Sequence, residues 1–163
     1  MKNLIILFLF IGINSVFGQT ITTYAEYSPK LVFTPISEYD IGQYINFGVT
    51  YWHNPEPDFW MIGVGGSIGY LDFYDYKFDQ LIRSNTIGGH FSLSDEDVWW
   101  GSAFVEYVWA HDNIITGIEA QLSLLENFPV KNCDIIFGLE MAYMFEFKRN
   151  IFGPQLGFIY ELH

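Results

Sequence analysis

Residues 135–147 read IIFGLEMAYMFEF and alternate between two kinds of side chain along their whole length. One face is uniformly apolar and consists of Ile135, Phe137, Leu139, Met141, Tyr143, Phe145 and Phe147. The other face mixes small, apolar and acidic residues, namely Ile136, Gly138, Glu140, Ala142, Met144 and Glu146. A period of two predicts a β-strand. A strand with one apolar and one mixed face is typical of a barrel with lipid outside and polar groups inside.

The same alternation recurs along most of the chain, in segments separated by turns rich in Asn, Asp and Pro. Seven strands are predicted, over 41–52, 58–71, 81–93, 97–110, 114–124, 133–147 and 151–162. An eighth is predicted over 20–28, since bacterial single-chain barrels have even strand numbers. The acidic segment 72–80 is expected to be an exposed loop. The pattern therefore predicts an all-β fold, an antiparallel up-and-down transmembrane β-barrel of eight strands.

The first eighteen residues have the features of a secretory signal peptide. Lys2 provides a positive start, residues 4–13 are apolar, and Val16-Phe17-Gly18 precedes a cleavage site before Gln19. The apolar stretch is too short to cross a bilayer as a helix. We therefore expect a signal peptide at 1–18 and a barrel domain at 19–163.

The charge, cysteine content and hydropathy of the chain exclude several classes of protein. The net charge is −12, and removal of Lys2 leaves 6 basic and 19 acidic residues, which argues against nucleic acid as a partner. A lone cysteine, Cys133, permits neither an intramolecular disulfide nor a Cys-rich metal site. Aromatic residues make up 20% of this acidic chain. After residue 18 no run of eighteen apolar residues predicts a transmembrane helix, so a barrel is the expected way to cross a membrane.

The tryptophans are placed as an aromatic girdle would require. Trp52 and Trp60 flank one predicted turn, and Trp99 and Trp100 follow the turn two strands later. Alternate turns lie on the same side of a barrel, so these four are expected at one rim and Trp109 near the other. Tryptophan prefers the membrane interface. The alternative is that the aromatics form the core of a soluble, secreted β-barrel that binds an apolar ligand.

The strand pattern of residues 19–163 resembles that of the small eight-stranded outer-membrane barrels, the OmpX-like proteins and the transmembrane domain of OmpA-like proteins. The chain departs from them at His163, where they usually have an aromatic residue, and at Gly153-Pro154, where a bulge or kink is expected. The signal peptide resembles those of Bacteroidota.

The resemblance implies the outer membrane of a Gram-negative bacterium, reached by Sec-type export. It implies a monomer that contacts membrane lipid or lipopolysaccharide, has no cofactor or metal and is not an enzyme. We therefore expect a structural or surface-interaction role, with the surface ligand or protein partner unidentified. We also expect a plugged interior and no open pore, because eight strands enclose little more than their own side chains.

Three carboxylates, Glu106, Glu119 and Glu140, fall on the predicted inner face. A two-residue turn at Asp112-Asn113 would place Glu106 opposite Glu119. Like charges in that arrangement are destabilising. The predicted polar cluster serves as a plug or, alternatively, as a proton or cation path.

A basic side chain would offset these charges. Arg83 lies at a matching height, but simple alternation points it outward. We hypothesise that a bulge at Gly88-Gly89 turns Arg83 into the interior, where it binds Glu106 and Glu119.

His90 and Ser92 form an H-x-S pair on one strand face, which resembles a fragment of the outer-membrane lipid A deacylases. In such a hydrolase His90 would act as base, Ser92 as nucleophile and Glu106 as the acid that orients the histidine. Two polar inward side chains near a rim are the alternative.

Overall fold

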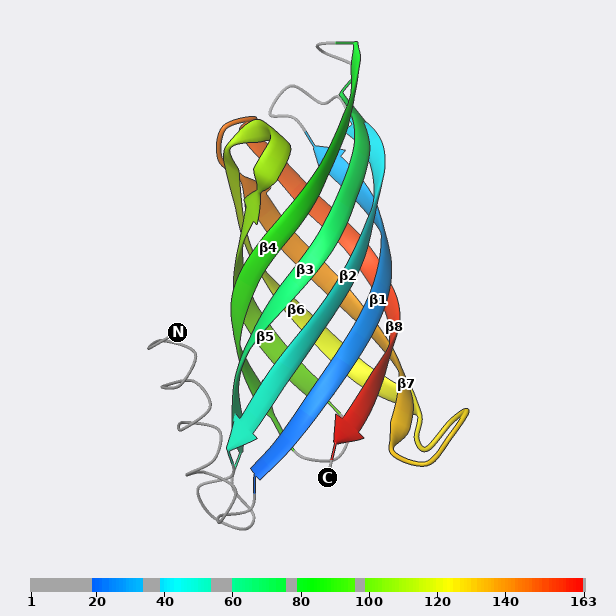
Figure 1. Cartoon of the computed structure of the whole chain (residues 1–163). Helices are drawn as coiled ribbons and strands as arrows, with labels where there is room; N and C mark the ends of the chain where they lie inside the picture. Colours follow the sequence, from blue (N-terminus) through cyan, green and yellow to red (C-terminus); the bar gives the residue numbers. More distant parts are fainter. Residues whose placement is uncertain (1–18, 34–38, 54–59, 76–78, 96–98, 163) are drawn as a thin grey trace.

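A computed structural model describes residues 19–33, 39–53, 60–75, 79–95 and 99–162 of the chain (Figure 1). The predicted signal peptide at 1–18 lies outside the described residues. Eight antiparallel strands close into one up-and-down barrel, in which each strand pairs with the next and β8 pairs with β1. This confirms the all-β, eight-stranded antiparallel barrel.

The strands are β1 (Gln19–Phe33), β2 (Tyr39–His53), β3 (Met61–Asp75), β4 (Gln80–Ser94), β5 (Trp99–Val108), β6 (Asn113–Leu125), β7 (Cys133–Met144) and β8 (Arg149–Leu162). A short 3-10 helix, η1 (Trp109–His111), follows β5. Among the described residues, no helix is long and apolar enough to cross a membrane.

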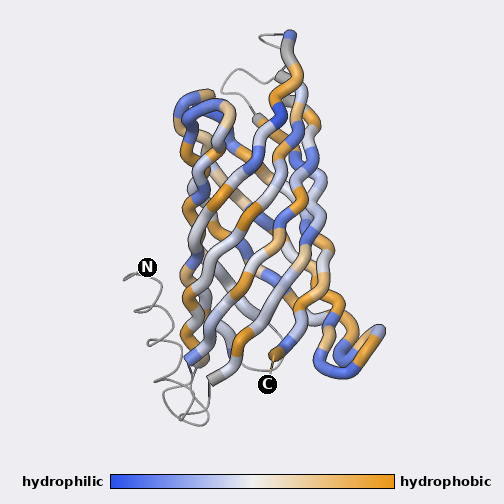
Figure 2. Tube along the Cα trace, in the orientation of Figure 1, coloured by the Kyte–Doolittle hydropathy of each residue, from blue (hydrophilic) through white to orange (hydrophobic). Residues whose placement is uncertain are grey.

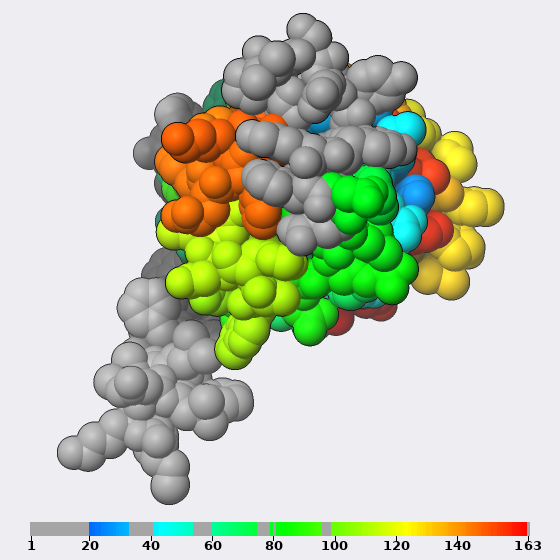
Figure 3. All heavy atoms as spheres, turned by 90° about the horizontal axis from the view of Figure 1, so that it is seen from above, coloured from blue at the N-terminus to red at the C-terminus, as the bar shows by residue number. Residues whose placement is uncertain are grey.

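The two ends of the barrel carry different segments. β1 begins and β8 ends at the same end, which we call the terminal end (Figure 1). The opposite, distal end carries η1 and the turn at 145–148. These two segments are neighbours in a view onto the distal end (Figure 3), where the rings of His111 and Phe147 meet edge to face, 5.7 Å apart. The two segments therefore lie side by side at the distal end.

Side chains alternate along each strand between the interior and the outer surface, and hydropathy changes with them along the trace (Figure 2). Among the described residues, 33 large apolar side chains are exposed, whereas 13 apolar and 19 polar or charged residues are buried. Soluble proteins bury apolar residues in preference to polar ones. The distribution here is inverted, because the buried volume is the barrel interior and polar residues occupy much of it.

The alternation predicted for 135–147 is confirmed through Met144, where β7 ends. Leu139 and Met141 point outward, and Gly138 and Glu140 point inward. The predicted strand is too long at its end, because residues 145–148 form a turn.

The interior has an apolar layer at the distal end, and each of the eight strands contributes to it. Its buried members are Val32, Tyr44, Leu71, Phe73, Ile82, Val108, Ile115, Ala142, Met144 and Ile151. Phe147 from the distal turn packs against Phe73, with 6.3 Å between ring centroids. Most polar residues of the interior lie between this layer and the terminal end. Ser84, Asn113 and Arg149 are also buried but lie at the height of the layer, opposite its members Leu71, Val108 and Met144.

The expected loop at 72–80 is wrong in extent, because β3 continues to Asp75 and β4 already begins at Gln80. Asp72 and Arg83 are cross-strand partners in this extended hairpin. The expected bulge at Gly88-Gly89 is also absent, since the register between β3 and β4 runs without a shift from Met61 to Asp75.

The ladder between β1 and β8 is interrupted at its middle. Pairing runs on either side of residues 28–30, which have no partners in β8. The register places Pro29 opposite Pro154, and neither residue has an N–H to donate. The pairing of Pro154 with β7 is regular, so the expected disruption at this proline is confined to the β1 side. Ser28 Oγ donates a hydrogen bond to the Pro154 carbonyl oxygen at 2.6 Å and bridges the gap.

We predict opposite responses to alanine at two adjacent glycines of β3. A Cβ on the inward Gly65 would collide with the Val49 carbonyl oxygen and the His90 ring, whereas on the outward Gly66 the nearest neighbour is 3.4 Å away. Gly65→Ala should destabilise the barrel by about 1–3 kcal/mol. Gly66→Ala should change stability by about 0.5 kcal/mol or less. Urea unfolding followed by tryptophan fluorescence measures both, and equal effects would contradict the assigned faces.

Candidate functional site inside the barrel

The polar layer is organised around a buried ion pair between Lys30 and Glu140. Lys30 Nζ contacts Glu140 Oε2, and the two side chains are 2% and 6% exposed. Lys30 comes from β1 and Glu140 from β7, so the pair spans the intervening strand β8. Gly153 of β8 is the cross-strand partner of Glu140, and a Cβ there would lie 3.1 Å from Lys30 Cδ. The absence of a side chain at Gly153 therefore leaves room for the lysine to cross.

Gln155 connects the ion pair to a second carboxylate. Its Nε2 atom lies 2.9 Å from Glu140 Oε2 and 2.9 Å from Glu119 Oε2. Gln121 extends the chain of hydrogen bonds, since its Nε2 donates to Gln155 Oε1 at 3.1 Å and to Glu26. One continuous network thus joins three carboxylates and Lys30.

Glu106 lies next to the apolar layer and is 4% exposed. The Tyr44 hydroxyl donates to Glu106 Oε1 at 2.6 Å, and Ser67 Oγ donates to the same oxygen at 3.2 Å. Tyr44 also lies 3.0 Å from Thr86 Oγ1. These hydroxyls replace part of the hydration that a buried carboxylate loses.

The structure places Glu106, Glu119 and Glu140 inside, but their pairing differs from the prediction. Glu119 stands opposite Glu140 across β6 and β7, whereas Glu106 stands opposite Ile115. The predicted Glu106–Glu119 pair is wrong because the connection is longer than two residues. η1 and Asp112, which has a left-handed conformation with φ 45°, separate Val108 from its partner Asn113.

The hypothesis that Arg83 enters the interior is wrong. Its side chain is 61% exposed and pairs with Asp72 on the outer face of the β3–β4 hairpin at 3.2 Å. Without a bulge at Gly88-Gly89, nothing reverses the face of β4. Lys30 instead provides the cation beside an interior carboxylate, and it lies beyond the predicted end of the first strand at residue 28. Arg149 is a second buried basic residue, near the distal end. Glu26, Ser28 and Lys30 all point inward at a spacing of two residues. Extending this alternation along the sequence would therefore have identified Glu26 and Lys30 as interior residues.

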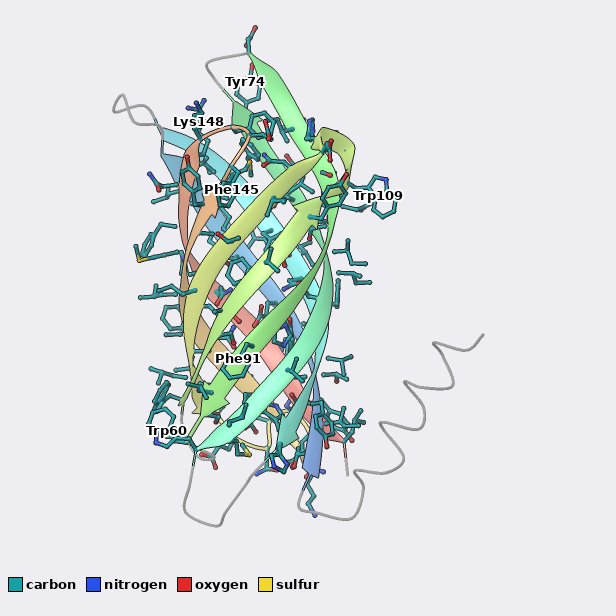
Figure 4. All side chains as sticks on the ribbon, turned by 90° about the vertical axis from the view of Figure 1, so that its left-hand side faces the viewer. Trp60, Tyr74, Phe91, Trp109, Phe145 and Lys148 are labelled. Atoms are coloured by element: carbon teal, nitrogen blue, oxygen red, sulfur yellow. The ribbon has the colours of Figure 1, made fainter. Side chains whose placement is uncertain are left out.

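The predicted girdle of Trp52, Trp60, Trp99, Trp100 and Trp109 divides into two groups. Trp60 and Trp99 lie outside and stack edge to face at 4.8 Å, and Trp109 is 69% exposed. Trp60 and Trp109 lie at opposite ends of the barrel (Figure 4). Trp52, Trp60, Trp99 and Trp100 all lie at the terminal end, as predicted. The prediction of an outer girdle is wrong for Trp52 and Trp100, which share the inward alternation of their strands. Trp52 is 5% exposed and donates to Thr22 Oγ1, and Trp100 lines an interior cavity.

His90 and Ser92 both point inward and are buried, but their contacts are separate. His90 Nε2 lies 2.8 Å from Thr50 Oγ1, and its Nδ1 lies 3.4 Å from the Tyr24 hydroxyl. Ser92 Oγ is hydrogen-bonded to Ser102 Oγ at 2.8 Å. The hydrogen bonds of His90 and Ser92 therefore lead to other hydroxyls, so the structure does not assemble the Ser92–His90–Glu106 sequence that a hydrolase would use.

Three cavities follow one another from the terminal end to the polar layer. The first has a volume of about 490 Å³ and is lined in part by Trp52 and Trp100. The second shares these residues with the first, and shares Tyr24 and His90 with the third. The second and third are each about 10 Å³, room for one water-sized sphere. The third reaches Glu106, so the path ends beneath the apolar layer.

The described residues contain no group of three or more His, Cys, Asp or Glu side chains arranged to hold a metal ion. No family model matches the chain, and neither a curated protein nor a solved structure matches it.

We predict that the buried and the exposed ion pair differ sharply in their contribution to stability. Lys30→Met would leave Glu140 buried without its cation and should destabilise the barrel by about 3–5 kcal/mol. Arg83→Met is the matched control at an exposed pair and should cost about 0–1 kcal/mol. Urea unfolding compares the two variants. A small effect of Lys30→Met would show that the interior network does not depend on this lysine.

Proposed function

We propose that this chain is an integral outer-membrane β-barrel with a structural or surface-interaction role. In this proposal residues 1–18 direct Sec-type export, and the barrel works as a monomer in contact with membrane lipid or lipopolysaccharide. The observation that carries the proposal is the outer face, where each of the eight strands exposes large apolar side chains. Contact of such a surface with water is unfavourable by about 25 cal/mol per Å², and lipid removes that cost.

Aromatic pairs near the two ends support a membrane band between them. Trp60 and Trp99 stack at the terminal end, and Tyr107 and Trp109 stack edge to face at 6.3 Å near the distal end. Side chains of this type favour the boundary between lipid and water. The strands between the two pairs would then cross the hydrocarbon region.

The interior supports a plugged barrel rather than a channel. The apolar layer receives buried side chains from all eight strands, and a charged or hydrated solute would have to displace them to cross it. In the proposed orientation the terminal end faces the periplasm and the distal end faces the outside. Surface interactions would then involve η1, the 145–148 turn and the extended β3–β4 hairpin.

The alternative of a soluble barrel that binds an apolar ligand has less support. The wide cavity at the terminal end is lined by Glu126, Asp134 and Glu161 among others, a lining that suits polar or cationic solutes. The alternative of a lipid hydrolase has less support because His90 and Ser92 face the interior and not the lipid.

We predict that arginine on the outer face destabilises the barrel in a depth-dependent way. Ile118 lies at the middle of β6 and is 61% exposed, and Ile114 lies on the same face near the strand end and is 45% exposed. In a bilayer, Ile118→Arg should cost about 2–4 kcal/mol and Ile114→Arg about 0–1 kcal/mol. Urea unfolding in lipid vesicles measures both. Two results together would favour the soluble alternative: the wild type stays soluble and monomeric without detergent, and Ile118→Arg and Ile114→Arg are tolerated equally.

We predict that the purified barrel, reconstituted with lipid A, releases no fatty acid from it, as measured by mass spectrometry of the lipid. Release that is abolished by His90→Ala and Ser92→Ala, but retained by Ser94→Ala on the same inner face, would instead establish the hydrolase.

A further inference from the structure

The third cavity contains a buried oxygen without a partner. Asn46 of β2 is 8% exposed, and its Oδ1 atom has no hydrogen-bond partner among the described residues. Its side chain lines the cavity together with Glu106, Glu119 and Glu140. A buried acceptor left unsatisfied costs about 1–3 kcal/mol. Asn46 Oδ1 therefore calls for a donor or a cation inside the cavity.

The hydroxyl groups around the cavity are already engaged elsewhere. Tyr44 and Ser67 donate to Glu106, and the Tyr24 hydroxyl lies 3.4 Å from His90 Nδ1. An amide oxygen and an ionised carboxylate both accept hydrogen bonds and cannot satisfy one another. The cavity thus offers mainly acceptor oxygens to whatever occupies it.

The surrounding charge favours a cation over a water molecule. Glu26, Glu106, Glu119 and Glu140 line the interior of the polar layer, and Lys30 is already paired with Glu140. Buried carboxylates are unfavourable unless a cation or a proton compensates them. A neutral water would satisfy Asn46 but leave this excess of acidic groups unchanged.

We propose that the third cavity binds a single monovalent cation of the size of Na⁺, coordinated by Asn46 Oδ1 and Glu106 and reached from the terminal end. The volume of about 10 Å³ fits one water-sized ion. Oxygen ligands suit hard cations. A divalent ion is disfavoured because no three acidic or histidine side chains of the described residues converge as a metal site. This site depends on the interior alone, whatever solvent the outer face meets.

The test compares thermal unfolding of the purified full-length barrel in NaCl and in choline chloride at equal ionic strength. Because a ligand that binds only the folded state stabilises it, Na⁺ should raise the Tm by about 3 °C or more. Asn46→Leu should abolish the difference between the salts, and Asn46→Asp should preserve or enlarge it. Asn85→Leu is the matched control, because Asn85 lies on the outer face of β4, and it should keep the wild-type difference.

Equal Tm values of the wild type in the two salts would overturn the proposal. So would an undiminished Na⁺ effect in Asn46→Leu, or a larger effect of Ca²⁺ than of Na⁺ on the wild type. If Asn46→Leu does not fold, broadening of the ²³Na resonance by the wild type, lost in Glu106→Gln, decides the same question. A wild type that leaves the resonance unchanged would equally overturn it.

Discussion

Eight strands enclose a volume that side chains alone can fill, and this limit governs where the chain places its rings, glycines and charges. Large inward rings lie where an inward glycine on a neighbouring strand leaves space, because a Cβ at that glycine would meet the ring. The pairs are Tyr24 with Gly48, Tyr44 with Gly69, Trp52 with Gly63, His90 with Gly65 and Phe104 with Gly117. Each large inward ring thus fills the space that a neighbouring glycine leaves free. These interior glycines are needed for packing and not for turns.

The same limit explains how the barrel closes. Backbone pairing between β1 and β8 fails where Pro29 meets Pro154, so part of the seam lacks the hydrogen bonds that hold the other strands together. At this height Lys30 crosses β8 above Gly153 and binds Glu140 of β7, and Ser28 bonds the Pro154 carbonyl. Side chains therefore replace backbone contacts at the seam. A buried ion pair often contributes little net stability, but here it connects two strands that are not neighbours, which favours one register of closure.

Much of the fold follows from the period of two, which also assigns Glu106, Glu119 and Glu140 to the interior. The pairing of these residues does not follow from it, because register depends on turn length. The sequence Asp112-Asn113 suggests a two-residue turn, yet Trp109 begins a 3-10 turn that lengthens the connection. The lysine was missed for a similar reason. The predicted first strand ends at residue 28 and leaves out Pro29 and Lys30. A proline can be accommodated where the ladder is interrupted, and the alternation continues through it to Lys30.

The asymmetry of the interior restricts what the barrel can do. Among the described residues, the cavities become smaller from the terminal end inward, and the last of them lies beneath the apolar layer. An ion that crossed that layer would have to displace its packed side chains and would lose most of its hydration, which is costly. The buried acids therefore suit retention of a proton or cation better than conduction. An effect that links the two ends of the barrel would have to be carried by the strands and turns themselves.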